Sequence, residues 1–162
     1  PNRYKYAKYV HSVDFMTMTG LQQLHTLSQP STIFTGMFGA TFAHLFWMNP
    51  KGSTAIMWRN EVLQNRIYDV VADLAGIRFI TLTLHREQCA ISGTAEIKFE
   101  YDRRKTIENA QPDDETAFRY TRDLTCYLDM EKLEVLISSS IEYSFHFHKC
   151  FSEGKGPDGP GF

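Results

Sequence analysis

One short segment of the chain has the composition of an anion-binding turn. In TIFTGMFGATFAHLF, residues 32–46, Gly36 and Gly39 interrupt a mostly apolar run, and His44 lies among aromatic residues. A glycine-containing turn between a buried strand and a helix lets the backbone approach a ligand closely, and it aims the free N–H groups of the helix start at that ligand. The helix dipole then favours an anion by about 0.3 to 1 kcal/mol. The same G-x-x-G spacing also fits glycines that serve only a tight turn and close helix packing.

Four segments rich in β-branched and aromatic residues predict strands in the first half of the chain. They cover residues 9–16, 32–36, 53–58 and 77–84. Helical patterns separate these segments, and such alternation is typical of a parallel sheet with right-handed crossovers. We therefore expect an α/β fold with a Rossmann-like parallel sheet and flanking helices. The turn after residue 36 would then lie at the carboxyl edge of the sheet, where phosphates bind in this kind of fold.

Three helices are predicted in the same half of the chain. A capping box at residues 19–22 opens the first helix, which Pro30 prevents from continuing. The second, at about 39–48, carries apolar residues on all sides, so we expect it to be buried on most of its circumference. The third is expected at about 60–76, where Gly76 follows the last periodic residue and suits a left-handed cap.

The second half of the chain does not continue this alternation. Residues 91–101 alternate between apolar and polar side chains, which predicts a half-exposed strand, and residues 102–115 are loop-like. LTCYL, residues 124–128, is interpreted as a returning core strand. Asp129 then caps a final helix with apolar residues at helical spacing.

The length of 162 residues predicts one domain, which we place at residues 1–153, with a ribbon and loop insert at about 85–123 and a flexible tail at 154–162. A formal net charge of -2 leaves no electrostatic footprint for nucleic acid, so no nucleic-acid partner is expected. No apolar run approaches the roughly 18 residues of a transmembrane helix. Any membrane association is therefore expected only through a segment outside these residues.

The cysteines and histidines of the second half do not suggest a metal site. Cys89, Cys126 and Cys150 have wide spacings that match neither a zinc pattern nor a disulfide framework. His146 and His148 are two residues apart, so they would point to different sides of a helix. We expect no bound metal, and the cysteines leave the redox compartment open.

A longer pattern surrounds the glycine turn. Its elements occur in the order Asp14-Phe15, Gln23-Leu24, Gly36, Gly39-Ala40, His44, Pro50 and Gly52. This order resembles the catalytic-domain core of glycosyltransferase family 61, which includes protein O-linked N-acetylglucosaminyltransferases and plant xylosyltransferases. YDVVADLAGIRF at 68–79 and DMEKLEVLI at 129–137 are similar to later elements of that family. The resemblance covers residues 10–83 well and residues 124–145 loosely.

The chain departs from the family pattern at two positions. Phe38 stands where the family usually has the histidine of its His-Gly-Ala motif. Met57 stands where an acidic or amide residue is common at the end of the third strand. Each change replaces a polar group with an apolar one, so either the donor is held differently or activity has been lost.

The resemblance implies an inverting, metal-independent enzyme of the GT-B type, with the chain forming its C-terminal, donor-binding half. The donor would be a UDP-sugar such as UDP-GlcNAc or UDP-xylose, which is a substrate, so no cofactor is expected. The acceptor would be a hydroxyl of a protein or glycan. Family members in eukaryotes work in the lumen of the secretory pathway, in the ER or Golgi. Inversion also requires a general base, and no residue is assigned to that role.

The same resemblance assigns donor binding to residues of the glycine turn, the following helix and a strand end. These residues are Gly36, Phe38, Gly39, Ala40, Thr41, His44 and Arg59. Backbone N–H groups would meet the charge that develops on the departing diphosphate. The alternative for His44 is a core histidine bonded to a backbone carbonyl, and the alternative for Trp58-Arg59-Asn60 is an ordinary strand end and helix cap.

Three functional hypotheses follow from different classes of protein. The first is an active glycosyltransferase, of which the chain is the donor half or a truncated form. The second is a catalytically inactive relative that keeps the fold as a binding or scaffold domain, which Phe38 and Met57 favour. The third is another α/β enzyme that binds a phosphorylated ligand in the same turn.

Overall fold

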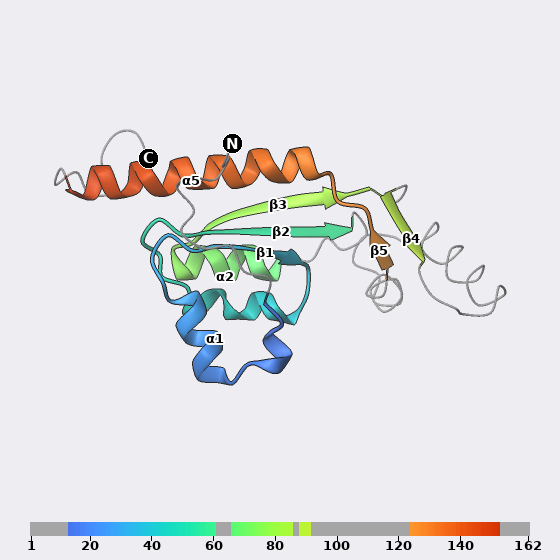
Figure 1. Cartoon of the computed structure of the whole chain (residues 1–162), viewed down its shortest axis with the longest axis horizontal. Coiled ribbons are helices and arrows are strands. Elements are labelled where there is room, and N and C mark those ends of the chain that lie inside the picture. Colours follow the sequence, from blue (N-terminus) through green and yellow to red (C-terminus); the bar gives the residue numbers. More distant parts are fainter. Residues whose placement is uncertain (1–12, 61–65, 86–87, 92–123, 153–162) are drawn as a thin grey trace.

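Three parallel strands form the centre of the protein. The computed structural model of the chain describes residues 13–60, 66–85, 88–91 and 124–152. The strands are β1 (Ile33–Met37), β2 (Thr54–Asn60) and β3 (Arg78–Leu84), in the order β1-β2-β3, and all three point to the same edge (Figure 1). The parallel sheet and its flanking helices confirm the expected mixed α/β class, in an arrangement compatible with a Rossmann-like fold.

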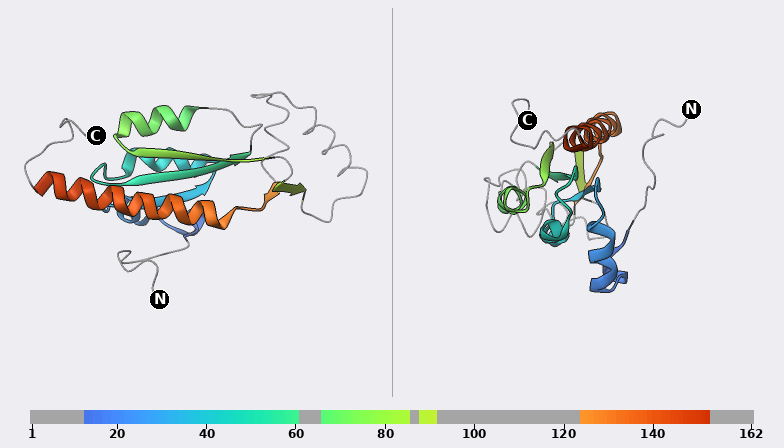
Figure 2. Two further views of the ribbon diagram at one scale, coloured as in Figure 1. Left: turned by 90° about the horizontal axis from the view of Figure 1, so that it is seen from above. Right: turned by 90° about the vertical axis from the view of Figure 1, so that its left-hand side faces the viewer.

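Helices cover both faces of this sheet. The 3₁₀-helix η2 (Ala40–Trp47) and the α-helix α2 (Ile67–Ala75) lie on one face, and the long helix α5 (Met130–Ser152) crosses the other (Figure 2). The main hydrophobic core fills the layer between the sheet and the first two helices. Its buried members are Leu27, Phe42, Leu45, Met48, Ala55, Met57, Ala72 and Ile77.

The helix after the glycine turn differs from the one expected from the sequence. η2 has three residues per turn, so its buried residues recur at that interval as Phe42, Leu45 and Met48. Thr41 and His44 are half-buried, whereas Phe46 and Trp47 are 57% and 46% exposed. The expectation of burial on most of the circumference was wrong, because a three-residue period presents only one row of side chains to the core.

The strand expected at residues 9–16 is also wrong where the structure describes it. Phe15–Thr17 form the short 3₁₀-helix η1, because the Asp14 carboxylate accepts a hydrogen bond from the Met16 N–H at 3.0 Å and closes a turn. Residues 9–12 lie outside the described residues. Helix α1 (Gly20–Leu27) then begins with the expected capping box, in which Thr19 and Gln22 bond each other's backbone.

The helix α2 begins later than the sequence predicted. Asn60 is the last residue of β2, so it does not start the helix; residues 61–65 lie outside the described part of the chain. The predicted end is confirmed, since Gly76 adopts the left-handed conformation with φ +67° and its N–H bonds the helix carbonyls.

The segment at 124–128 is not a core strand of the parallel sheet. β5 (Leu124–Cys126) pairs antiparallel with β4 (Cys89–Ile91), and this second sheet lies beyond the carboxyl end of β3 (Figure 1). Asp129 caps α5 as expected, because its carboxylate accepts bonds from the Glu131 and Lys132 N–H groups, both at 3.1 Å. The predicted strand beyond Ile91, the loop at 102–115 and the tail at 154–162 lie outside the described residues.

Candidate functional site

The candidate site lies at the carboxyl edge of the parallel sheet. β1 ends at Met37, and the Phe38 N–H then bonds the Trp58 carbonyl of β2 at 2.7 Å, which fixes the position of the turn. Gly39 follows as the residue before η2. Helix α2 starts on the same side of the sheet and runs back along it, so two helix starts point toward this edge (Figure 1).

The start of η2 presents unpaired backbone donors. No side chain caps the helix, and its first backbone bond from the turn is that of the Phe42 N–H to the Gly39 carbonyl at 3.0 Å. Among the described residues, no acceptor is bonded to the N–H groups of Gly39, Ala40 or Thr41. Such groups need a partner, and an anion at a helix start satisfies them.

Gly39 leaves space at this position. Its φ of 171° is ordinary extended backbone that any residue adopts, so no strain requires glycine here. A Cβ built at Gly39 would meet only the Met37 carbonyl oxygen, at 3.9 Å. The space that a side chain would fill is thus open beside the unpaired N–H groups.

Gly36 has a different role. It lies inside β1, in register with Met57, and a Cβ there would touch the Phe42 ring at 3.6 Å. That contact belongs to the hydrophobic core, so a side chain at Gly36 would press on the core ring of Phe42. Of the two glycines of the motif, Gly39 alone adjoins the free donors.

Phe38 and Met57, which depart from the family pattern, are both packed. The Phe38 ring meets the Tyr68 ring edge-on at 5.3 Å, and burial raises the pKa of the Tyr68 hydroxyl. Met57 is fully buried in the core layer beneath η2 and α2. Both side chains therefore contribute to packing near the site.

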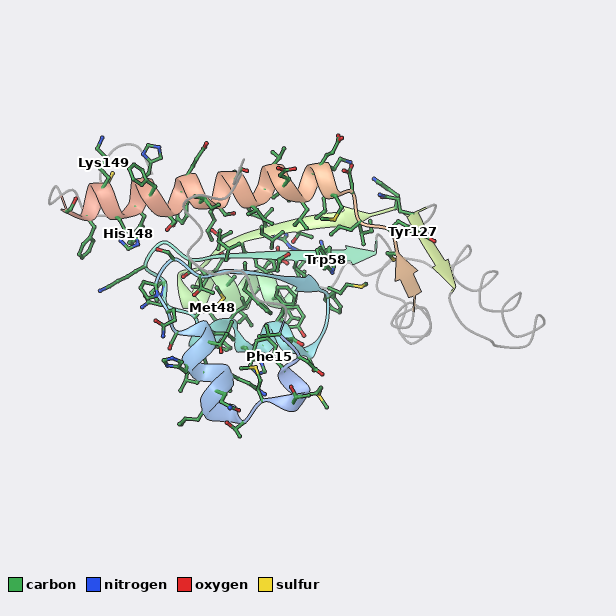
Figure 3. All side chains as sticks on the ribbon, viewed as in Figure 1. Phe15, Met48, Trp58, Tyr127, His148 and Lys149 are labelled. Carbon is green, nitrogen blue, oxygen red and sulfur yellow. The ribbon has the colours of Figure 1, made fainter. Side chains whose placement is uncertain are left out.

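Arg59 brings a positive charge to the same face of the sheet. Residues two apart in a strand point to the same face of the sheet. Arg59 therefore lies on the same face as Met57, which is the face that η2 and α2 cover. Trp58 lies on the opposite face, toward α5, at the end of β2 (Figure 3). Its indole N–H is buried and has no partner among the described residues.

His44 lies farther along η2 and is held by α1. Its Nε2 atom is 2.7 Å from the Gln23 Oε1 atom. The centroid of its ring lies 5.4 Å from the ring centroid of Phe15, which is labelled in Figure 3, and 4.8 Å from that of Trp47. The His44 side chain therefore forms a polar contact between η2 and α1. The sequence-based alternative to ligand binding was a bond to a backbone carbonyl, but the observed partner is the side chain of Gln23.

The structure brings six of the seven assigned residues to the carboxyl edge in two groups, while His44 lies farther along η2 against α1. Gly39, Ala40, Thr41 and Arg59 surround the open helix start, while Gly36 and Phe38 support it through packing. Sequence reasoning did not give Gln23 a role. The capping box already accounted for the neighbouring Gln22. The one signal available was therefore a second amide, that of Gln23, on the side of α1 that faces His44.

A shallow surface hollow lies elsewhere, on α1. It has a volume of about 420 Å³ and is lined by Met18, Thr19, Leu21, Gln22, His25 and Thr26. None of the assigned donor-binding residues lines it, so it does not enlarge the candidate site.

Within the described ranges, no helix combines the length and apolar character needed to cross a bilayer.

The cysteines differ from the sequence-based expectation. Cys126, in β5, is disulfide-bonded, and the strand register places Cys89 opposite it. Cys150, in α5, is a free thiol. The wide sequence spacing concealed this disulfide, because the antiparallel pairing that positions Cys126 depends on contacts between distant segments.

No protein-family model matches this chain, and comparison with curated proteins and with solved structures gives no match. The functional inference therefore depends on the geometry of the carboxyl edge and on the sequence resemblance.

Proposed function

We propose that this chain is the donor-binding part of an inverting glycosyltransferase of the family 61 type, which transfers a sugar such as GlcNAc or xylose from a UDP-sugar to a protein or glycan hydroxyl. The observation that carries the proposal is the open start of η2. Within the part of the chain that the structure describes, the N–H groups of Gly39, Ala40 and Thr41 have no acceptor, and a Cβ at Gly39 would meet only the Met37 carbonyl oxygen. Both features suit a diphosphate at the carboxyl edge of a parallel sheet.

The chemistry of the proposed reaction fits these groups. When the sugar leaves a nucleoside diphosphate, negative charge builds up on the phosphate oxygen that is released. Preorganised backbone N–H groups stabilise such charge without reorganising at the moment of reaction. The guanidinium of Arg59, on the same face of the sheet, adds a positive charge. These groups supply the stabilisation that a divalent metal provides in other sugar transfers.

The oxidation state of Cys126 supports a secretory location for this activity. Disulfides persist mainly in oxidising compartments, such as the ER lumen and the cell exterior. We therefore propose that the protein works in the lumen of the ER or Golgi. Mass spectrometry after alkylation without reductant should find Cys150 modified and Cys126 protected. Full alkylation of Cys126 in protein from the native source would contradict this location.

The proposed function is tested by thermal unfolding of the chain with UDP, UDP-GlcNAc and UDP-xylose, each at millimolar concentration. A ligand present at 100 times its Kd stabilises a protein by about 2.7 kcal/mol, which raises the Tm by several degrees. ADP and GDP serve as controls for the base. A Tm that rises with UDP or a UDP-sugar is the expected result, and a folded chain that responds to no nucleotide would sink the proposal.

A second candidate function is a catalytically inactive relative that binds or scaffolds other molecules. The packing of Phe38 favours it, since the ring contacts Tyr68 where the family pattern has a histidine. The two candidates differ in the response to Phe38→His. If the inactive relative is correct, no UDP-sugar raises the Tm of the wild-type chain, and the reversion restores a rise; if the first candidate is correct, the wild-type chain already responds.

A further inference from the structure

The hydrogen bonds of Gln23 fix the orientation of its side-chain amide. Its Nε2 atom donates to two backbone carbonyl oxygens, Phe15 O at 2.7 Å and Met18 O at 3.1 Å. Carbonyl oxygens only accept hydrogen bonds, so the amide nitrogen must point at them. The other amide atom, Oε1, consequently faces His44.

This orientation determines where His44 carries its proton. The Gln23 Oε1 atom is an acceptor, and it lies 2.7 Å from His44 Nε2, so Nε2 must be the N–H group. In the neutral ring, the second nitrogen, Nδ1, is then an acceptor with a free lone pair. Among the described residues, Nδ1 has no hydrogen-bond partner.

His44 lies on the same row of η2 as Thr41, which belongs to the open helix start. Thr41 and His44 are three residues apart in a 3₁₀-helix, so they lie on one row, about 6 Å apart along the axis. Helical side chains lean toward the N-terminus, which carries the imidazole toward Thr41. Contacts with the Phe15 and Trp47 rings restrict its rotation.

An acceptor atom at this position can bind only a ligand group that donates a hydrogen bond. A phosphate oxygen is itself an acceptor at neutral pH, so it gains nothing from a nitrogen lone pair. A sugar hydroxyl donates a hydrogen bond and is suited to it. We propose that His44 reads the sugar of the bound nucleotide, with Nδ1 accepting a sugar hydroxyl and Gln23 positioning the ring. This inference rests on the proposed function, because it requires a UDP-sugar whose phosphates occupy the helix start.

The tautomer is tested on the unmodified chain. Imidazole ¹⁵N spectra at pH 8 should show His44 with its proton on Nε2, and the missing signal in His44→Leu assigns the resonance. Addition of the UDP-sugar should move the Nδ1 resonance, whereas UDP alone should leave it in place. A proton on Nδ1 in the free protein, or an equal response to UDP and to the UDP-sugar, would overturn the inference.

Binding measurements on variants test the same selection. In titration calorimetry at pH 8, His44→Leu should weaken the UDP-sugar about two- to tenfold, the value of one hydrogen bond, and leave UDP within twofold. Gln23→Met should weaken the UDP-sugar too and shift the tautomer in the ¹⁵N spectrum. The matched control is His25→Leu, an exposed histidine on α1 that should change neither affinity.

The outcomes separate this inference from the proposed function. If UDP fails to bind the wild-type chain, the proposed function falls, and this inference falls with it. If UDP and the UDP-sugar bind normally and His44→Leu changes neither affinity, only the inference about His44 is overturned. An equal loss of both ligands in a folded His44→Leu protein would also overturn it, because that result assigns His44 to the nucleotide or phosphate.

Discussion

The two edges of the parallel sheet have opposite character. At the amino edge, polar groups from distant segments bond one another: Ser31 Oγ lies 2.6 Å from His148 Nε2, and the Thr32 N–H bonds Ser53 Oγ at 3.0 Å. At the carboxyl edge, the backbone donors of the helix start after Gly39 have no acceptor in the described ranges. Figure 3 shows His148 and Trp58 near these opposite ends. The comparison shows that distant segments bond one another at the amino edge, while the start of η2 at the carboxyl edge has backbone donors without an acceptor among the described residues.

Helix α5 is the element that closes the amino edge. Arg78, the first residue of β3, donates to the Ser139 carbonyl at 3.1 Å and to the Ser139 hydroxyl at 3.0 Å, and its guanidinium lies over the Tyr143 ring at 4.9 Å. Gly52 packs beneath the same helix, since a Cβ there would lie 3.2 Å from Ser144 Oγ. These contacts pack α5 closely against this edge of the sheet.

The largest effect is expected at Gly52. This residue has φ +71°, and a Cβ would also come within 3.4 Å of the Ser144 Cα atom, which belongs to the helix backbone. Gly52→Val should therefore lower the free energy of unfolding by about 3 kcal/mol, from backbone strain and overpacking together. Urea denaturation measures the loss. Gly20→Ala is the control, because a Cβ at Gly20 meets nothing within 4 Å; a loss below about 1 kcal/mol in Gly52→Val would contradict the close packing of this edge.

The corresponding change at the carboxyl edge should affect binding and spare the fold. Gly39→Val introduces a branched side chain into open space on an extended backbone. We expect UDP affinity to fall at least tenfold, about 1.4 kcal/mol, while the free energy of unfolding changes by less than about 0.5 kcal/mol. Calorimetric titration and urea denaturation measure the two quantities. Unchanged UDP affinity would show that the phosphate lies elsewhere.

Two arginines provide a matched pair across the sheet. Arg78→Met removes two hydrogen bonds to Ser139, so unfolding should become easier by about 1 kcal/mol while UDP affinity stays within twofold. Arg59→Met should instead weaken UDP binding, because it removes the positive charge on the face where the helices begin. Both variants are compared with the wild type by urea denaturation and calorimetry. A reversed pattern, with Arg78→Met impairing UDP binding more, would contradict the division between the edges.

The smallest effect concerns the cap of α5. Backbone hydrogen bonding from Lys132 is the main cause that lowers the pKa of Asp129 below its usual value of 3.8. A carboxylate whose pKa is lowered by folding contributes its full stabilisation at pH values above the pKa that it has in the unfolded chain. This contribution disappears as the pH falls through the pKa of the folded state. Urea midpoints measured downward from pH 5 should thus decline less steeply below pH 4 in Asp129→Asn than in the wild type. Parallel declines would show that the cap contributes nothing measurable.

Features controlled by neighbouring residues could be predicted from the sequence. The capping box at Thr19 and Gln22, the left-handed cap at Gly76 and the cap at Asp129 all depend on residues within one turn of each other. Three of the four strand segments predicted in the first half were also found, since apolar runs separated by helical patterns predict a parallel sheet, while the segment at 9–16 was wrong where the structure describes it. Local chemistry and simple periodicity are sufficient for these elements.

Features that depend on distant contacts could not be predicted in this way. Ser31 and His148 are 117 positions apart, and no local pattern announces their bond. The pairing of β5 with β4 and the disulfide state of Cys126 depend on segments separated by a long insert. The three-residue period of η2 was missed because its composition is apolar on every side, which hides the periodicity that distinguishes one helix type from another.

The candidate site was predictable in place but not in detail. A glycine turn that directly follows a predicted parallel strand places the candidate site at the carboxyl edge of the sheet. Which glycine adjoins the donors depends on side-chain direction, and the structure assigns Gly36 to the core and Gly39 to the open space. The tautomer of His44 depends on Gln23, which belongs to another helix.

The most direct test is a titration of the ¹⁵N-labelled chain with UDP, followed by amide NMR. If a diphosphate occupies the start of η2, the largest shifts should be those of the Gly39, Ala40 and Thr41 N–H groups, in the direction that stronger hydrogen bonding produces. Amides of the closed edge, such as those of Gly52 and Ser53, should remain in place. Shifts confined to other residues, or no shifts at millimolar UDP, would contradict a phosphate site at the carboxyl edge.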